Sequence, residues 1–301
     1  CEKGVIGGGQ SSRNWGWVRK MGRDPRELPL IVESLRLWEG LDARVGGETG
    51  FRRSGILYIS DGPKDAAGYE AWLEHARPYQ IDSRMLSADE TAALLPGLGR
   101  RFAGGLYTAS DGRAEPQKAA PAIAVAAQHL GATVLQECAV RGIERAGGKV
   151  AGVVTERGSI ACSAVVLAGG AWSNLFCGNL GIDLPQLKVK NSVLRTEPIE
   201  GGLPQVAMSA GNYAFRKRLD GGYTIADGDA NDVDIVPDSF RYFRHFRPAL
   251  RSQWDALHLH FGGAFFREWS VARRWSLDQV TPCERMRILD PAVDKAVARL
   301  T

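Results

Sequence analysis

The sequence feature that most constrains the fold is the stretch AVVLAGGAWS, which begins at Ala164. A continuous apolar run that ends in two glycines and the start of a helix is typical of a strand buried on both faces. Such strands lie at the centre of parallel sheets, and open α/β sheets bind ligands at the carboxyl ends of these strands. We therefore expect a central parallel strand at 164–168 and a ligand near Gly169 and Gly170.

The rest of the chain predicts an α/β protein with a second, antiparallel layer. A helix at 116–130 followed by a strand supplies a crossover unit, and a Gly147-Gly148 turn joins two short strands. After residue 183 the pattern changes to that of antiparallel strands. Before residue 183, helices are predicted at 24–41, 64–77 and 87–95, the last from the capping-box order Ser87-x-x-Glu90. Strands are predicted within RRSGILYIS and at 133–140, 149–155 and 159–162.

The first residues, CEKGVIGGG, contain glycines but not a phosphate-binding turn. The G-x-G-x-x-G spacing is absent, and Glu2 and Lys3 stand where a buried strand would need apolar residues. In dinucleotide folds an acidic residue about twenty positions after the glycine turn binds the ribose hydroxyls. We interpret Glu2 as that acid, at the end of a strand that begins before residue 1.

Composition and charge narrow the class of protein. A chain of 301 residues with 44% hydrophobic residues favours two joined cores. The net charge of +4 is too small to favour nucleic acid, and the arginines of RYFRHFRPALRSQW are interpreted as one solvated helix face. Five cysteines without a CxxC pair indicate thiols in a reducing compartment, so we expect a cytoplasmic protein. No apolar run reaches the roughly 18 residues that a membrane span needs.

Several further motifs contain residues that are suited to binding a ligand or a metal. In GQSSRNWGWVR, the hydroxyls of Ser11 and Ser12, the Arg13 guanidinium and the glycine-exposed backbone suit a pyrophosphate. The acidic stretch DGDANDVDIVPD resembles a calcium loop, but its sixth and twelfth positions are Asp rather than Gly and Glu, so an acidic turn between strands is favoured. His258 and His260 share one strand face without further ligands, and we expect no metal site. Hydrolase motifs are absent.

With these residues in view, the chain resembles the family of FAD-dependent oxidoreductases that includes D-amino-acid oxidase, glycine oxidase and sarcosine oxidase. The resemblance runs from Cys1 to about Glu284 and rests on CEKG…GQSSRNWGWVR, DGRAEPQKAAPAIAVAAQHLGA, VAGVVTERGSIACSAVVLAGGAWSN and YAFRKRLDGGYTIADG, taken in order. It implies a partial Rossmann-like FAD-binding domain at 1–50 and 105–185. A substrate domain with an antiparallel sheet is implied at 51–104 and 186–283, followed by an incomplete C-terminal segment at 284–301.

The resemblance also implies the site residues, while no catalytic residue is assigned. For FAD the implied positions are Glu2 at the adenosine ribose, with Lys3 beside it as a further cofactor-binding residue, and the backbone of Val140 at adenine. Ser11, Ser12 and Arg13 are implied in the phosphate and flavin-facing loop, and Ala168, Gly169, Gly170 and Trp172 near the ribityl and phosphate portion. For the substrate they are Tyr213 and Arg216 in the cavity wall, and Arg19 or Lys20 at a carboxylate, of which Arg19 is nominated.

The implied activity is oxidation of the C–N bond of an amino acid or secondary amine by hydride transfer to FAD, giving an imine. Relative to the family the chain is truncated at both ends, since the first strand with its glycine turn and the C-terminal segment that returns to the flavin are absent. The alternative is a non-catalytic fragment that does not retain FAD. The expected partner is a small-molecule amine or amino acid, and the oligomeric state stays open.

Overall fold

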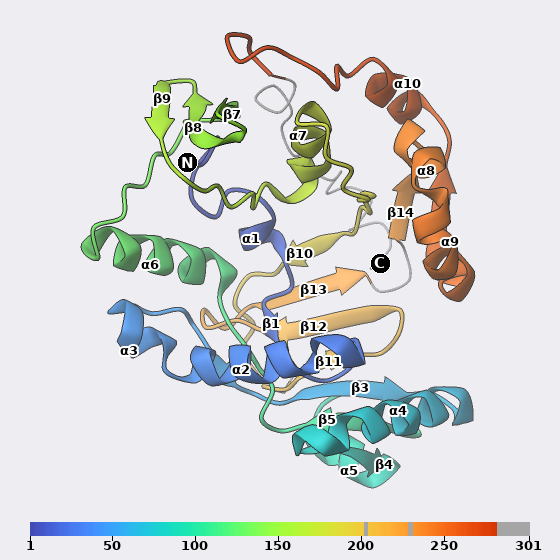
Figure 1. The fold of residues 1–301 in the computed structure, drawn as a ribbon. Coiled ribbons are helices and arrows are strands. Elements are labelled where there is room, and N and C mark those ends of the chain that lie inside the picture. The colour runs from blue at the N-terminus through green and yellow to red at the C-terminus, as the bar shows by residue number, and fades with distance from the viewer. Residues whose placement is uncertain (202–203, 228–230, 282–301) are drawn as a thin grey trace. The chain divides into compact units, whose positions relative to one another are not determined.

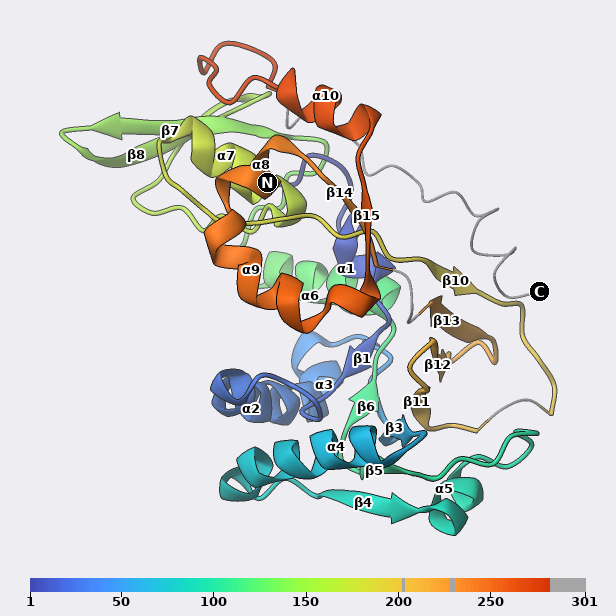
Figure 2. The ribbon, with the colours of Figure 1, turned by 90° about the vertical axis from the view of Figure 1, so that its right-hand side faces the viewer.

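The computed structural model describes residues 1–201, 204–227 and 231–281, which form two compact units. Among the described residues, unit 1 comprises residues 1–10, 132–191 and 231–281, and unit 2 comprises residues 11–131, 192–201 and 204–227. Figures 1 and 2 show their elements. The domain boundaries expected from the resemblance stay a prediction, and their last segment, 284–301, lies outside the described residues.

Unit 2 is built on a mixed sheet of seven strands (Figure 1). All neighbouring strands are antiparallel except β11 and β3, which are parallel. The mixed α/β class is therefore confirmed, as are the antiparallel strands expected after residue 183. In order across the sheet, the strands are β10 (Val193–Arg195), β13 (Tyr223–Asp227), β12 (Tyr213–Lys217), β11 (Ala207–Ser209), β3 (Ile56–Ser60), β5 (Gly104–Thr108) and β4 (Ser83–Ser87).

The two faces of this sheet carry different core clusters because side chains alternate along a strand. Leu57 and Ile59 of β3 pack in one cluster with Met208 and Phe215, whereas Ile56 belongs to another. Tyr69, Trp72 and Leu73 of α4 (Pro63–Ala76) cover the second cluster. The sheet is thus buried on both sides within unit 2.

The helices predicted in unit 2 begin and end close to their expected positions, whereas the short helices at 10–13 and 41–45 were not predicted. Asp24 caps the 3-10 turn η1 (Pro25–Glu27) through the Arg26 N–H, and Ser87 and Glu90 form the predicted capping box. The other elements are α1 (Gln10–Arg13, whose first residue belongs to unit 1), α2 (Leu28–Glu39), α3 (Leu41–Val45), η2 (Arg77–Tyr79), α5 (Ala88–Leu94), α6 (Pro116–His129), and a small sheet of β1 (Trp17–Val18), β6 (Gly112–Arg113) and β2 (Arg52–Arg53).

Unit 1 contains a three-stranded antiparallel meander of β7 (Val140–Ala146), β8 (Lys149–Thr155) and β9 (Gly158–Ala161). Gly147 and Gly148 both have positive φ, 56° and 78°, as the predicted two-residue turn requires. Unit 1 also holds η3 (Gly170–Trp172) and α7 (Ser173–Asn179).

A second part of unit 1 is a parallel strand pair joined by helices. Strand β14 (Asn231–Asp234) runs parallel to β15 (Leu257–His260). Between them lie α8 (Pro237–Arg241), α9 (Phe243–Ser252) and η4 (Trp254–Ala256), and α10 (Gly263–Trp269) follows (Figure 2). The arginines of the basic-aromatic stretch therefore lie on helices, as the sequence predicted.

Two strand predictions in unit 1 are wrong. Residues 164–168 form no strand, and Val166 is 92% exposed. The apolar run predicted burial, but burial in a sheet needs a neighbouring strand, and no described strand pairs with this segment. The strand expected at 133–140 begins instead at Val140, after Glu137 adopts the left-handed φ of 48° and interrupts the extended backbone.

Candidate functional site

The first residues of the chain pair with the segment that leads into β7 in unit 1. The Glu2 N–H donates to the Leu135 carbonyl at 2.8 Å, and the Cys138 N–H donates to the Glu2 carbonyl at 2.9 Å. Cys138 is completely buried, so the pairing is anchored in the interior of unit 1. Because Val140 follows two residues later, Glu2 and Val140 lie in the same part of this unit.

Lys3 joins this segment to the turn before α7. Its Nζ lies 3.5 Å from the centroid of the Trp172 ring. A cation this close to an indole face is stabilised by about 0.5–2 kcal/mol, more as water is excluded. Residues 2–3 and residues 169–172, which the resemblance assigned to one cofactor, are thus brought together in unit 1. Their role in binding stays a prediction.

The groups gathered here fit the adenosine and phosphate end of a dinucleotide. The Gly4 N–H donates to Glu2 Oε1 at 2.8 Å, which holds the carboxylate in one orientation. A carboxylate in a fixed orientation accepts hydrogen bonds from a ribose diol. Gly170 has a φ of 54°, and apart from its neighbours along the chain no atom lies within 4 Å of the place where a Cβ would stand, so an anion's oxygens can approach its backbone. Ala168 is exposed on the same segment.

The predicted phosphate loop forms the short helix α1, and Ser11, Ser12 and Arg13 belong to unit 2. The Gln117 Nε2 donates to the Ser12 carbonyl at 2.9 Å, and the Asn14 amide donates to the Ser11 carbonyl at 3.1 Å. Gln117 lies in the first turn of α6, so this loop is fixed to the start of that helix.

The two alternatives for a substrate carboxylate differ in their contacts. Lys20 is nearly buried, donates to Ser110 Oγ at 2.6 Å and lies 3.4 Å from Asp111 Oδ1, so its charge is already paired. The Arg19 guanidinium lies 5.6 Å from the Tyr58 ring, and burial lowers the pKa of Arg19. Arg19 is therefore the alternative whose guanidinium forms no ion pair with a carboxylate among the described residues, whereas Lys20 already has one.

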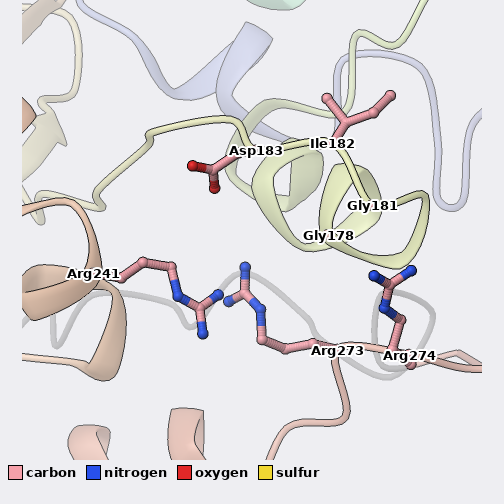
Figure 3. A pocket seen from close by; sticks show the side chains of 7 residues that line it. All are labelled: Gly178, Gly181, Ile182, Asp183, Arg241, Arg273 and Arg274. Carbon is pink, nitrogen blue, oxygen red and sulfur yellow. The ribbon is translucent and has the colours of Figure 1, made fainter.

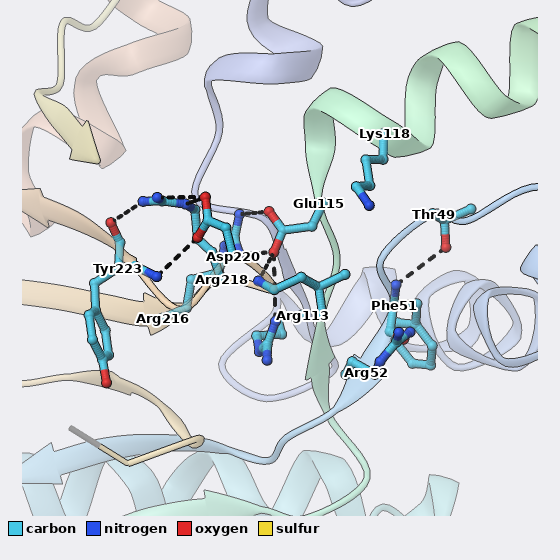
Figure 4. Close-up of polar contacts among 12 residues, drawn as sticks. Thr49, Phe51, Arg52, Arg113, Glu115, Lys118, Arg216, Arg218, Asp220 and Tyr223 are labelled. Atoms are coloured by element: carbon cyan, nitrogen blue, oxygen red, sulfur yellow. Dashed lines mark hydrogen bonds and ion pairs between the residues drawn. The ribbon is translucent and has the colours of Figure 1, made fainter. Parts of the chain in front are cut away.

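Arg216 lies at the centre of a buried ion-pair network in unit 2 (Figure 4). It is 1% exposed, and its two terminal nitrogens donate to the Glu115 carboxylate at 2.9 and 3.1 Å. Its Nε donates to the Trp15 carbonyl at 2.5 Å, and the Leu219 N–H donates to the same carboxylate at 3.0 Å. These contacts fix the backbone at Trp15, while the predicted role of Arg216 in substrate binding stays a prediction.

A second guanidinium shares this carboxylate. Arg113 is 5% exposed, and its Nη1 lies 3.6 Å from Glu115 Oε1. Burial, together with the nearby charge of Arg216, lowers the pKa of Arg113, and its Nε has no hydrogen-bond partner among the described residues. Sequence reasoning missed Glu115 and Arg113 because Glu115 and Arg216 are 101 positions apart, and only the charged residues of DGRAEP pointed toward them.

Tyr213 begins strand β12 and is half-buried against the core cluster of Leu57 and Phe215. Burial raises the pKa of its phenol. A neutral hydroxyl at the end of a strand can donate a hydrogen bond to an anion, which is compatible with the substrate role that the resemblance implies.

The acidic stretch that resembled a calcium loop is partly a strand. Its residues 231–234 form β14, and the His260 ring Nε2 lies 2.7 Å from Asp232 Oδ1. Among residues 1–201, 204–227 and 231–281, no three His, Cys, Asp or Glu side chains cluster as a metal site would require. In the same residues no helix has the length and apolar character to span a membrane.

Solved structures resemble this chain closely. The L-amino acid deaminase from Proteus vulgaris superposes with a TM-score of 0.90 at 28% identity, covering 99% of this chain and 71% of that one. The L-amino acid deaminase from Proteus myxofaciens, solved in complex with anthranilate, gives a TM-score of 0.88 at 31% identity, covering 94% of this chain and 64% of that one.

Curated proteins are also similar to this chain in sequence. The sarcosine oxidase subunit beta of Rhodobacter capsulatus is 26% identical over 232 residues, which is 75% of this chain and 56% of the relative. The human mitochondrial sarcosine dehydrogenase is 28% identical over 252 residues, 80% of this chain and 27% of the relative. The chain thus spans about half or less of the length of these relatives.

The family described as FAD dependent oxidoreductase matches residues 1–297. This match covers every position used in the resemblance to the family, which is thereby confirmed. The chain belongs to the family of FAD-dependent oxidoreductases.

Proposed function

We propose that this chain forms the cofactor- and substrate-binding part of an enzyme that oxidises the C–N bond of an amino acid or amine. The observation that carries the proposal is the family match over residues 1–297, since FAD is the cofactor of this family and the named relatives act on amino acids or N-methylated amines. That match does not favour the alternative of a non-catalytic fragment.

In this proposal the residues of unit 1 hold the adenosine end of FAD. The Glu2 carboxylate accepts hydrogen bonds from the ribose hydroxyls, Lys3 offsets phosphate charge, and the open backbone at Gly170 approaches a phosphate oxygen. The Ser11, Ser12 and Arg13 side chains supply further donors to the pyrophosphate. When bound, FAD supplies the acceptor for a hydride equivalent from the substrate.

The substrate side of the proposal uses residues of unit 2. Arg19 pairs with the substrate carboxylate, and Tyr213 and Arg216 belong to the wall of the substrate cavity, as the resemblance implies. The chain's task is to orient the C–H bond beside the nitrogen, and no general base is needed if the amine arrives neutral. The product is an imine, which water hydrolyses.

The cofactor roles are tested by titrating FAD into the chain and following the quenching of flavin fluorescence. Glu2→Gln keeps the shape of the side chain and removes its charge, so we expect FAD affinity to fall about tenfold, as for one charge-assisted hydrogen bond. Glu144→Gln is the matched control, because Glu144 is half-buried in β7 of the same unit and accepts a hydrogen bond from Ser159 Oγ at 3.0 Å. Equal affinities for the wild type and Glu2→Gln would remove Glu2 from the site.

The reaction is tested with a panel of small amines under anaerobic conditions. Glycine, N-methylglycine, D- and L-amino acids and secondary amines are mixed with the FAD-loaded protein, and the flavin absorbance is recorded. We expect at least one class to bleach the visible band, with bleaching slowed in Arg19→Met when the substrate bears a carboxylate. Bleaching of Arg19→Met at the wild-type rate would exclude Arg19 as the carboxylate anchor.

A further inference from the structure

A pocket of about 310 Å³ in unit 1 is lined by Gly178, Gly181, Ile182, Asp183, Arg241, Arg273 and Arg274, none of which the proposed function uses (Figure 3). These residues belong to the end of α7 and the loop after it, to α8, and to the segment 273–274. Three of its lining side chains are arginines, namely Arg241, Arg273 and Arg274. Figure 3 shows the guanidinium groups of Arg241 and Arg273 pointing toward one another, with Asp183 across from them.

Arg273 is held in place by buried partners. Its Nη1 donates to both oxygens of Asp238 at 3.0 and 2.9 Å, and its Nη2 donates to Asn174 Oδ1 at 3.3 Å. Asp238 and Asn174 are 9% and 7% exposed. A guanidinium fixed in this way loses little further conformational freedom when it binds a ligand.

Arg274 is fixed by the backbone beside it. Its Nη1 donates to the Asn179 carbonyl at 2.9 Å, and the Trp275 N–H donates to Asn179 Oδ1 at 2.9 Å. The Trp275 indole donates to the Arg141 carbonyl at 2.8 Å, which ties the segment to β7. Among the described residues Arg274 has no carboxylate partner, so its charge is available to a ligand.

The opposite wall carries one acceptor. Asp183 Oδ1 accepts a hydrogen bond from the Tyr242 hydroxyl at 2.7 Å, and that hydroxyl accepts one from the Asn174 amide at 3.0 Å. Tyr242 is 1% exposed, so Asp183 is oriented from the interior. Its other hydrogen-bonding positions can accept from a hydroxyl or amine of a ligand.

The charges around the pocket do not balance. The Asp238 carboxylate forms an ion pair with Arg273, and its Oδ1 also lies 3.5 Å from Arg241 Nη1. Two guanidinium groups therefore share one carboxylate. With Arg274 and Asp183 included, three positive groups face two negative ones. Planar guanidinium forks match the oxygens of a phosphate or a similar dianion. We propose that this pocket binds a doubly charged oxyanion, the phosphate group of a small molecule, at a site separate from the predicted FAD positions.

Calorimetric titration of inorganic phosphate into the full chain tests this proposal. Excess FAD is present throughout, so that phosphate does not compete for the predicted cofactor loop, and chloride at equal ionic strength measures simple screening. Arg274→Gln removes one pocket charge without touching the buried Arg273–Asp238 pair, and Arg241→Gln removes a second. Arg244→Gln, on the exposed side of α9, makes the same change in net charge outside the pocket.

We expect saturable phosphate binding that weakens about tenfold in Arg274→Gln and in Arg241→Gln and is unchanged in Arg244→Gln. Circular dichroism of each variant checks that it is folded. The proposal is overturned if chloride reproduces the heat, if binding does not saturate, or if Arg244→Gln weakens it as much as Arg274→Gln. These results leave the proposed oxidoreductase function untouched, because no residue in this test belongs to it.

Discussion

Replacing Glu115 by Gln tests the buried network of unit 2 most severely. The carboxylate accepts from Arg216 Nη1 at 2.9 Å, from Arg216 Nη2 at 3.1 Å and from the Leu219 N–H at 3.0 Å, and it lies 3.6 Å from Arg113 Nη1. Glutamine has one acceptor oxygen in place of two, so its NH₂ group faces a donor. Two buried guanidinium groups are then left without a counter-charge.

The expected loss follows from this geometry. Removing one partner of a buried ion pair costs about 3–5 kcal/mol, because the charge that stays behind is desolvated and unpaired. For a folding unit of about 150 residues this lowers the melting temperature by roughly 10 °C. Urea unfolding followed by circular dichroism measures the difference. Glu48→Gln is the control, since Glu48 pairs with Arg52 and Lys118 at the surface, where we expect no measurable change.

A double-mutant cycle separates an unpaired charge from lost packing. If the cost of Glu115→Gln comes from the uncompensated guanidinium, Arg216→Met combined with it will be much less destabilising than the sum of the two single changes. Additive effects, or a loss from Glu115→Gln of under about 1 kcal/mol, would refute the reasoning.

Three further outcomes are expected. Gly16→Ala will destabilise unit 2 by about 2–4 kcal/mol, because a Cβ there would lie 2.6 Å from Arg216 Nε. Gly46→Ala is the control: its φ of 63° is also positive but the space around it is open, so we expect a cost of only about 1–2 kcal/mol. Equal urea midpoints for the two variants would contradict this. Burial raises the pKa of Tyr69 from its usual 10.0 to about 12. The stability that the buried phenol contributes is therefore complete below pH 10.0 and is lost as the pH rises toward 12. In urea titrations over this range, the free energy of unfolding of Tyr69→Phe should fall less than that of the wild type. Ser87→Ala will remove the capping box of α5 and lower the free energy of unfolding by about 1 kcal/mol, and an unchanged midpoint would show that the cap contributes nothing.

Local signals made the helices predictable. The capping box at Ser87 and the proline at the start of α6 act within one turn, so these helices begin at or within a residue of the expected positions. The Gly147-Gly148 turn is equally local, because a two-residue hairpin of this type needs positive φ at both positions.

The apolar run at 164–168 shows that composition alone does not predict a strand. Its composition predicts a buried strand, but a strand exists only through hydrogen bonds to a neighbour, and composition carries no information about that neighbour. The segment is exposed in unit 1 for this reason.

The candidate site residues also differ in whether the sequence could predict that they lie close together. Residues 2–3 and 169–172 could be paired in advance because an ordered set of motifs resembles a known family. Glu115 and Arg216 are 101 positions apart, and Arg241 and Arg273 are more than thirty, so no local period joins them. Such clusters follow only from the tertiary fold, which brings distant guanidinium and carboxylate groups together.

We propose that this chain belongs to an enzyme that oxidises amines or amino acids with FAD. The most direct test of this claim is the visible spectrum of the FAD-loaded protein during anaerobic addition of the amine panel. We predict that the yellow band bleaches with at least one amino acid or secondary amine and returns when an electron acceptor is added. A protein that takes up FAD but keeps its oxidised spectrum with every member of the panel would contradict the claim.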